Sequence, residues 1–258
     1  MGKLKQAFED KKKLTGPFMK LLDPGIVEVF GHAGFDFVIF DTEHGPINTE
    51  SMADLIRAAQ LVGISPNVRI RSNDPSLISQ ALDLGAEGIL IPHISDAASA
   101  RDAVKASLFA PKGERGVCCY VRSADYSHLN KQAYFKKAND STVIIPFIEG
   151  NEGINNLNEI IKVEGIGAIF IGPYDLSQSM GVPGEIDHPQ VTRKMEEVVH
   201  IAKNAGLAVG TFVDDVQSAS RWMNLGVQYI AYSVDVGIIY NASKSIVTDL
   251  RKEGKKLR

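Results

Sequence analysis

The sequence predicts an α/β protein, a single (β/α)8 TIM barrel that extends over residues 1–258. Three observations lead to this fold. Short apolar runs alternate eight times with stretches of helical spacing. The runs are apolar almost throughout, which is typical of parallel strands buried on both faces. The chain of 258 residues is close to the roughly 250 residues of one such barrel. The structural alternative is a doubly wound open sheet.

The first half of the chain contains four strand–helix units. Residues 35–41 (FDFVIFD) are aromatic and β-branched, as expected of a strand. Residues 49–61 have helical spacing of apolar side chains, with Asn48 as the N-cap and Glu50 in the first turn. The predicted strands are 18–22, 35–41, 67–70 and 88–94, and the helices are 24–33, 49–61, 75–84 and 96–108.

The second half contains four further units after a long polar segment. Residues 110–127 are punctuated by Gly and Pro and are predicted to form a loop. Loops of this length often act as lids or interface elements. The predicted strands are 143–149, 168–172, 207–213 and 228–233, and the helices are 153–161, 189–205, 216–225 and 238–252.

Composition and charge exclude several classes of protein. The formal net charge of −3 gives no basic field for nucleic acid or membrane lipid. No run reaches the roughly 18 uncharged apolar residues of a membrane helix, and the N-terminus lacks the apolar segment of a signal peptide. Cys118 and Cys119 are adjacent and have no other cysteine to pair with. A cytoplasmic location is therefore expected.

Two acidic residues at strand ends predict a metal site. In a (β/α)8 barrel the active site lies at the carboxyl ends of the strands. Glu149 follows the fifth predicted strand and Asp175 follows the sixth, so the two lie on neighbouring strands. Two carboxylates brought together repel each other unless a proton or a cation lies between them. Oxygen ligands suit Mg²⁺ or Mn²⁺. The alternative is an exposed Glu and a helix-capping Asp.

Other polar residues at the same end are candidates for substrate binding and proton transfer. The guanidinium of Arg69 can hold a carboxylate or an enolate oxygen, or form a structural ion pair. His44 follows two acids and is a candidate proton-transfer group or a structural residue. The turn at Gly172 can offer backbone N–H groups to a substrate anion. Alone, Asp83 is interpreted as a surface charge, and Lys20 as a Schiff-base lysine has no supporting motif.

The motifs in combination resemble the HpcH/HpaI aldolase family of class II pyruvate aldolases. This family includes 4-hydroxy-2-oxoheptanedioate aldolase and 2-keto-3-deoxy sugar-acid aldolases. The resemblance extends from about residue 16 to residue 240. It is carried by FVIFDTEHGP, LDLGAEGILIPHI, GERGV, IEGNEGINNLNEI and IFIGPYDLSQSMGVPG.

The resemblance implies a metal-dependent lyase. The reaction is cleavage or formation of a carbon–carbon bond in a 4-hydroxy-2-oxo acid, with pyruvate and an aldehyde as the products of cleavage. The implied cofactor is a divalent cation, Mg²⁺, Mn²⁺ or Co²⁺. The implied assembly is a homo-oligomer, a hexamer or a trimer of dimers, that acts on a small keto acid and an aldehyde.

The resemblance also assigns roles to individual residues. Glu149 and Asp175 match the metal ligands. Arg69 matches the arginine that stabilises the enolate, and Gly172 and Tyr174 stand in the substrate-binding loop together with Asp175.

A catalytic pair is implied as well. His44 matches the catalytic base. Asp83 matches the acid that raises the basicity of this histidine, which replaces the interpretation of Asp83 as a surface charge.

The chain departs from the family pattern at two positions. Phe147 stands where the family commonly has a Gln that helps to bind the keto acid, and Phe cannot donate that hydrogen bond. Tyr174 stands where the family usually has a small residue, so its ring narrows the pocket. The alternatives to an aldolase are a related metal-dependent lyase of the citrate-lyase or phosphonopyruvate type, and a non-catalytic barrel.

Overall fold

The computed structural model describes residues 2–128 and 130–256, which form a closed barrel of eight parallel strands in the order β1 to β8. This confirms the predicted (β/α)8 fold. Residues 1, 129, 257 and 258 of the predicted domain lie outside the described residues. The strands are β1 (Leu14–Met19), β2 (Phe37–Asp41), β3 (Ser65–Arg69), β4 (Gly88–Ile91), β5 (Val143–Ile148), β6 (Ala168–Ile171), β7 (Ala208–Val213) and β8 (Tyr229–Val234).

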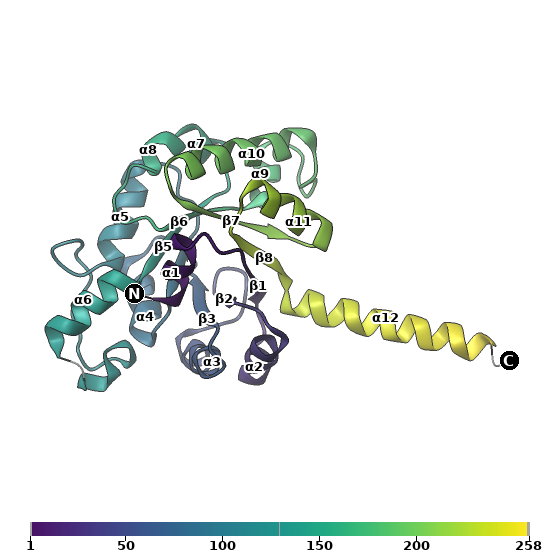
Figure 1. Cartoon of the computed structure of the whole chain (residues 1–258), viewed down its shortest axis with the longest axis horizontal. Coiled ribbons are helices and arrows are strands. Elements are labelled where there is room, and N and C mark those ends of the chain that lie inside the picture. Colours follow the sequence, from purple (N-terminus) through teal and green to yellow (C-terminus); the bar gives the residue numbers. More distant parts are fainter. Residues whose placement is uncertain (1, 129, 257–258) are drawn as a thin grey trace.

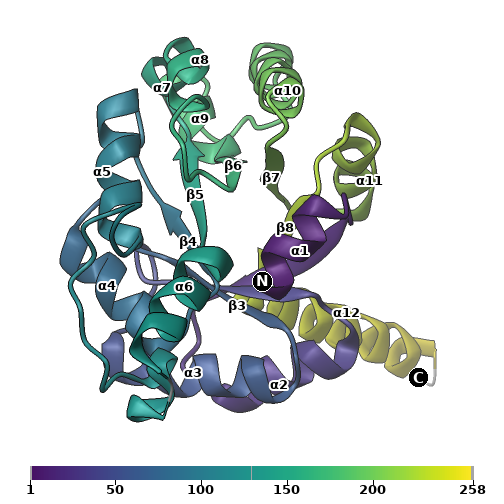
Figure 2. The same cartoon turned by 60° about the vertical axis from the view of Figure 1, so that its left-hand side comes forward.

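Helices surround this barrel as an outer layer (Figure 2). None of the described helices has the length and apolar character needed to cross a membrane. The helices are α1 (Lys3–Glu9), α2 (Pro24–Ala33), α3 (Thr49–Leu61), α4 (Pro75–Leu84), α5 (Ala97–Ser107), the 3-10 segment η1 (Arg122–Ser127), α6 (Lys131–Ser141), α7 (Asn151–Asn155), α8 (Leu157–Ile160), α9 (Pro173–Ser179), α10 (Pro189–Asn204), α11 (Val216–Leu225) and α12 (Asp235–Lys256).

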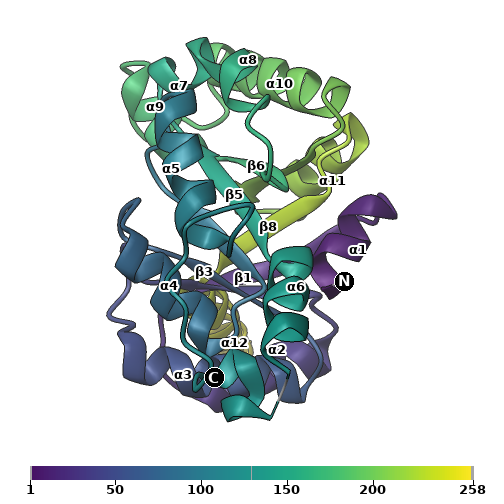
Figure 3. The ribbon, with the colours of Figure 1, turned by 90° about the vertical axis from the view of Figure 1, so that its left-hand side faces the viewer.

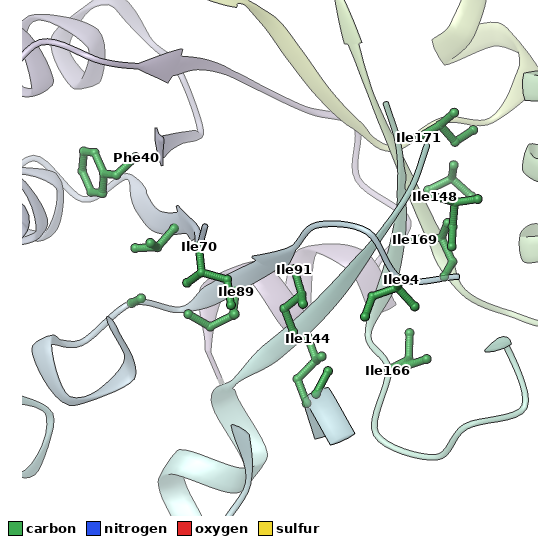
Figure 4. Packing of buried hydrophobic residues seen from close by; sticks show 14 of the residues in the cluster. Phe40, Ile70, Ile89, Ile91, Ile94, Ile144, Ile148, Ile166, Ile169 and Ile171 are labelled. Carbon is green, nitrogen blue, oxygen red and sulfur yellow. The ribbon is translucent and has the colours of Figure 1, made fainter. Parts of the chain in front are cut away.

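Two apolar layers hold the barrel because alternate strand residues face opposite sides. The inner layer contains Phe37, Phe170 and Tyr229, all fully buried. The outer layer fills the space between strands and helices, and Figure 4 shows its part around β4–β6, where Ile91 and Ile144 lie. Burial on both faces explains why most strand positions are apolar.

Short polar side chains begin several outer helices at the carboxyl end of the barrel. The side chain of Asn48 accepts from the backbone N–H of Ser51 at the start of α3. Asp74 and Asp96 cap α4 and α5 in the same way. These caps satisfy backbone donors that have no partner inside the helix, so the loops that carry the polar rim begin at defined positions.

Two strands differ from their predicted bounds by three or more residues, and the other six agree to within two residues. The first strand is Leu14–Met19 instead of 18–22, because the backbone N–H groups of Lys20 and Leu21 donate to the carboxylate of Asp235 and do not continue the ladder. The fourth strand ends at Ile91 instead of residue 94. Pro92 has no N–H to donate, and His93 has a φ of 57°.

Three α-helices were not predicted, because each is either short or has a weak amphipathic pattern. Helix α6 buries only Tyr134, and α1 and α9 have seven residues each. Phe8 of α1 packs edge-on against the ring of Tyr229, with centroids 5.6 Å apart. The N-terminus of the described chain and α6 lie side by side (Figure 3), where Gly2 contacts Ser141.

The last helix is placed differently from the others. Helix α12 begins directly after β8 and extends away from the barrel (Figure 1). The predicted range 238–252 falls within the observed Asp235–Lys256. Its side chains Ile239, Tyr240, Ile246 and Leu250 are exposed.

Candidate active site

A cavity of about 300 Å³ opens at the carboxyl end of the barrel. Its walls come from β1, β3, β5, β6, β7 and β8 and from the loops that follow the strands, which is where barrel enzymes place their active sites. Its apolar lining consists of Phe18, Phe147, Phe170, Pro173, Phe212 and Val234, and its polar lining of Lys20, His44, Arg69, Gly172, Tyr174 and Asp175.

Asp41, the last residue of β2, organises one side of this cavity. Its carboxylate accepts two hydrogen bonds from Arg69, from Nε at 3.0 Å and Nη2 at 2.8 Å. It also accepts from the backbone N–H groups of Glu43 and His44, and Lys20 Nζ lies 3.7 Å away. Burial acts to raise the pKa of Asp41, but hydrogen bonds and charge from Arg69 outweigh it and hold this pKa below its ordinary value.

Arg69 is fixed on its other sides as well. Its guanidinium carbon lies 4.8 Å from the ring centre of Phe18 and 5.5 Å from that of Phe147. Its Nη1 is 3.3 Å from Glu43. A guanidinium held by carboxylates and aromatic faces keeps one orientation, so Arg69 presents a positioned charge to the cavity.

A chain of contacts leads from Glu43 through His93 to Glu149. His93 Nε2 lies 3.3 Å from Glu43, and its Nδ1 lies 3.0 Å from Glu149. The backbone N–H of His93 donates to the same Glu149 oxygen at 2.8 Å. The left-handed backbone of His93 brings its N–H and its ring to one carboxylate oxygen. Strands β2, β4 and β5 are therefore connected at their carboxyl ends.

Glu149 and Asp175 lie at the ends of neighbouring strands, as the sequence indicated. Glu149 is 7% exposed, and burial raises its pKa above the ordinary value. The negative charges of Asp175 and Glu43 raise this pKa further. Gly172 lies close by, since a Cβ there would be 3.1 Å from a Glu149 oxygen. A larger residue at this position would therefore have to displace the Glu149 side chain slightly.

This donor set fits a hard divalent cation. A cation beside Glu149 offsets both its burial and the charge of Asp175, and carboxylate oxygens are the ligands that Mg²⁺ and Mn²⁺ prefer. Within residues 2–128 and 130–256, no group of three or more His, Cys, Asp or Glu side chains is arranged to hold a metal ion. A cation held by Glu149 and Asp175 would take its remaining ligands from water and substrate oxygens.

Tyr174 forms the outer wall of the cavity. Its hydroxyl donates to Asp214 at 2.6 Å, and its ring packs against Phe212 with centroids 5.8 Å apart. Burial first, and then the charge of Asp214, raises the pKa of Tyr174 to about 12. The loops after β6 and β7 are connected by this contact.

The structure brings His44 to the cavity but not Asp83. The His44 side chain is 57% exposed, with Nε2 3.8 Å from Glu43. Asp83 lies in the last turn of α4, which leads back to the amino ends of the strands, and its carboxylate accepts from Arg115 at 2.5 Å. Helix α4 runs antiparallel to the strands, so its last turn lies at their amino ends, whereas His44 lies at their carboxyl ends. Within one chain, Asp83 therefore does not contact His44.

Several site residues were missed or undervalued from the sequence. Asp41 and Glu43 drew attention only as neighbours of His44, His93 stands in the LDLGAEGILIPHI motif without an assigned role, and Lys20 lies in no motif. Their position just after strand ends was the available signal. The contacts that join them come from five strands, and sequence spacing does not encode them.

The comparisons with known proteins all identify the same family. The profile of the HpcH/HpaI aldolase/citrate lyase family matches residues 14–242. The "4-hydroxy-2-oxo-heptane-1,7-dioate aldolase" of Shigella sonnei (strain Ss046) is 33% identical over 243 residues, covering 94% of this chain and 92% of that protein.

Solved structures give the same result. An HpcH/HpaI aldolase/citrate lyase family protein from Burkholderia cenocepacia J2315 is 31% identical with a TM-score of 0.92, covering 97% of this chain and 100% of that chain. The citrate synthase SbnG is 31% identical with a TM-score of 0.88, covering 98% of each chain.

Proposed function

The chain belongs to the HpcH/HpaI aldolase/citrate lyase family of carbon–carbon lyases, and from this premise we propose that it is a class II aldolase. The proposed reaction cleaves or forms the carbon–carbon bond of a 4-hydroxy-2-oxo acid, with pyruvate and an aldehyde on the other side. The observation that carries the proposal is that Asp175 and Arg69 line one cavity, while the charge of Asp175 acts on the buried carboxylate of Glu149 at the end of the neighbouring strand.

A divalent cation, Mg²⁺, Mn²⁺ or Co²⁺, is the proposed cofactor. Glu149 and Asp175 are the residues that would hold it. When bound, it supplies Lewis-acid stabilisation of the negative charge that develops on the keto oxygen. The raised pKa of Glu149 supports this role, since a buried carboxylate gains most from a neighbouring positive charge.

Arg69 stabilises the same developing charge. As the bond between C3 and C4 breaks, its electron pair moves into the oxo acid and the keto oxygen becomes negative. Arg69 is already oriented by Asp41 and by Phe18, so its charge needs little reorganisation during the reaction. The backbone N–H of Tyr174, which follows Gly172, is the proposed contact for the substrate carboxylate.

His44 is the proposed proton carrier. In cleavage it removes the proton from the C4 hydroxyl, directly or through water, and the aldehyde leaves. C3 is then protonated to give pyruvate. Its exposed ring at the cavity is suited to exchange with water.

We propose that Asp83 acts on His44 only across a subunit boundary. Within one chain, Asp83 pairs with Arg115 and lies away from His44. Both side chains are partly exposed, 26% for Asp83 and 57% for His44. A homo-oligomer, such as a hexamer or a trimer of dimers, would bring together Asp83 of one subunit and His44 of another.

The direct test uses the metal-loaded protein with pyruvate and small aldehydes. We expect condensation, retro-aldol cleavage and metal-dependent exchange of the pyruvate methyl protons with D₂O, followed by NMR. Exchange needs no aldehyde, so it tests the enolate chemistry apart from acceptor choice. Absence of all three activities with Mg²⁺, Mn²⁺ and Co²⁺ would exclude the proposed function.

The similarity to the citrate synthase SbnG favours a second candidate. This candidate is carbon–carbon bond formation or cleavage by a related lyase acting on a larger oxo acid. The same metal and Arg69 would stabilise the negative charge that develops in this second reaction. Parallel assays with oxaloacetate as acceptor distinguish it from the aldolase, which needs an aldehyde.

A further inference from the structure

We propose that Lys20 contacts the substrate, holding a carboxylate oxygen of the oxo acid through its ammonium group. The inference rests on the proposed function, because it assigns a further binding residue to the same cavity. Lys20 lies just after β1 and lines the cavity together with Arg69 and His44. No role follows for it from any sequence motif.

The backbone of Lys20 is held in place by a buried carboxylate. Asp235 is fully buried and accepts from the N–H of Lys20 at 3.1 Å and of Leu21 at 2.8 Å. It also accepts from the N–H of Val236 at 2.7 Å. Asp235 thus ends β1, begins α12 and fixes the position from which the Lys20 side chain leaves the chain. A residue anchored in this way can present its charge reproducibly.

Lys20 is held less tightly by Asp41 than Arg69 is, so its ammonium group is freer to bind a substrate. Arg69 gives two hydrogen bonds to Asp41 and a further contact to Glu43. Lys20 Nζ, in contrast, is 3.7 Å from Asp41, beyond hydrogen-bond length, and its side chain is 32% exposed. The ammonium group of Lys20 can therefore bind the carboxylate of an incoming substrate, because Arg69 still balances the charge of Asp41.

Apart from Arg69, His44 and the backbone N–H of Tyr174, most of the cavity wall is apolar. Phe18, Phe147, Phe170 and Phe212 present apolar faces to the cavity. Phe147 stacks on Phe170 with centroids 4.4 Å apart, so the ring is fixed and contributes no hydrogen-bond donor. A carboxylate that leaves water for such a pocket needs a positive partner, and Lys20 supplies it.

The test compares Lys20→Met with wild type in the metal-loaded full-length protein. In the pyruvate proton-exchange assay we expect the KM for pyruvate to rise about 10- to 100-fold, the range for a hydrogen bond to a charged group, with kcat changed much less. Isothermal titration with oxalate should show a parallel loss of affinity. Lys162→Met is the matched control, because Lys162 is 68% exposed and pairs with Glu159 on the surface.

A rescue variant separates substrate contact from a structural role. Phe147→Gln places an amide donor in the same cavity, so it should recover much of the pyruvate affinity of Lys20→Met and add little to wild type. The pyruvate affinity of Lys20→Gln, whose side chain keeps a hydrogen-bond donor, should fall between those of Lys20→Met and wild type. The thermal midpoints of all variants are measured to confirm that they fold.

Three results would overturn the inference. One is an unchanged KM and oxalate affinity in a folded Lys20→Met. Another is lost affinity that neither Lys20→Gln nor Phe147→Gln recovers, which indicates a structural role. The third is covalent trapping of pyruvate on Lys20 by borohydride, because the proposed contact is ionic. If wild type shows no exchange, the proposed function fails, and the oxalate titrations still decide the role of Lys20.

Discussion

Arg69 donates from two of its nitrogens to the two carboxylate oxygens of Asp41, Nε to Oδ1 at 3.0 Å and Nη2 to Oδ2 at 2.8 Å. The pair joins the ends of β2 and β3, where Asp41 and Arg69 are also partners in the strand register. Asp41 is fully buried and Arg69 is 9% exposed. A buried ion pair of this kind is costly to break from one side, because the remaining charge has no partner.

Replacement of Asp41 by Asn should destabilise the protein by about 3 kcal/mol at pH 7, since it leaves Arg69 without its anionic partner. The pKa of Asp41 is lowered in the folded state, so its stabilising contribution is present above the unfolded value of about 3.9 and is lost as the pH falls through the lower, folded pKa. The difference between wild type and variant should therefore shrink below about pH 4.

Urea unfolding at a series of pH values measures this difference. Asp54→Asn serves as the control, because Asp54 is 62% exposed and pairs with Arg57 within α3. A gap between Asp41→Asn and wild type that stays constant from pH 7 to acid would contradict the lowered pKa.

Removal of either proposed metal ligand should abolish the effect of metal. At a concentration 100 times its Kd, a ligand stabilises the folded state by about 2.7 kcal/mol. Mn²⁺ should therefore raise the thermal midpoint of wild type but not of Glu149→Ala or Asp175→Ala. Loss of charge stabilisation should lower kcat by about 10²–10³-fold or more. Glu152→Ala, at an exposed position in α7, is the control, and an equal metal shift in all four proteins would refute the site.

Tyr174 should limit the size of the aldehyde. Its ring lines the cavity and is held by Asp214 and Phe212. Tyr174→Ala should raise kcat/KM for bulky aldehydes relative to acetaldehyde by about tenfold, in the range of small pocket changes. Tyr174→Phe keeps the ring and should leave the ratio almost unchanged. Equal ratios in the Ala and Phe variants would argue against a steric role.

The hydroxyl of Tyr174 should lose its proton only at a pH well above the ordinary value for tyrosine. Its pKa is raised to about 12 by burial and by Asp214, so it remains a hydrogen-bond donor throughout the physiological range. Any stabilisation linked to its proton is complete below the unfolded pKa of about 10 and is lost as the pH rises through about 12. The ultraviolet difference titration of wild type against Tyr174→Phe measures this pKa. Asp214→Asn should bring it closer to 10, and a normal pKa in wild type would contradict the contact.

Two inactive variants should complement each other if Asp83 acts across subunits. His44→Ala and Asp83→Ala are each expected to lose most activity. Mixed after dissociation and reassembly, they form some sites that carry both native residues, about a quarter of all sites in a dimeric arrangement. Recovery of activity on mixing is the expected result. No recovery, with mixed oligomers demonstrated by mass spectrometry, would rule out the shared site.

The sequence alone predicted the barrel, which the structure confirms, and it indicated the carboxyl end of the strands as the place for a site. Alternation of buried strands with amphipathic helices is a local property, and eight such units in about 250 residues are typical of a closed barrel. The placement of Glu149 and Asp175 follows from the same order, because consecutive parallel strands are neighbours and their carboxyl ends meet at one rim. The helices that were not predicted, such as α6, bury few residues and leave little pattern to detect.

The tertiary structure decided which polar residues of that rim work together. The contacts of His93 with Glu43 and Glu149, and the anchoring of Lys20 by Asp235, join residues from strands far apart in sequence. It also placed Asp83 beside Arg115 and away from His44. The reason is physical: periodicity fixes which side of its own element a residue faces, whereas side-chain partners depend on strand register, helix direction and the competition of many charges for few buried positions.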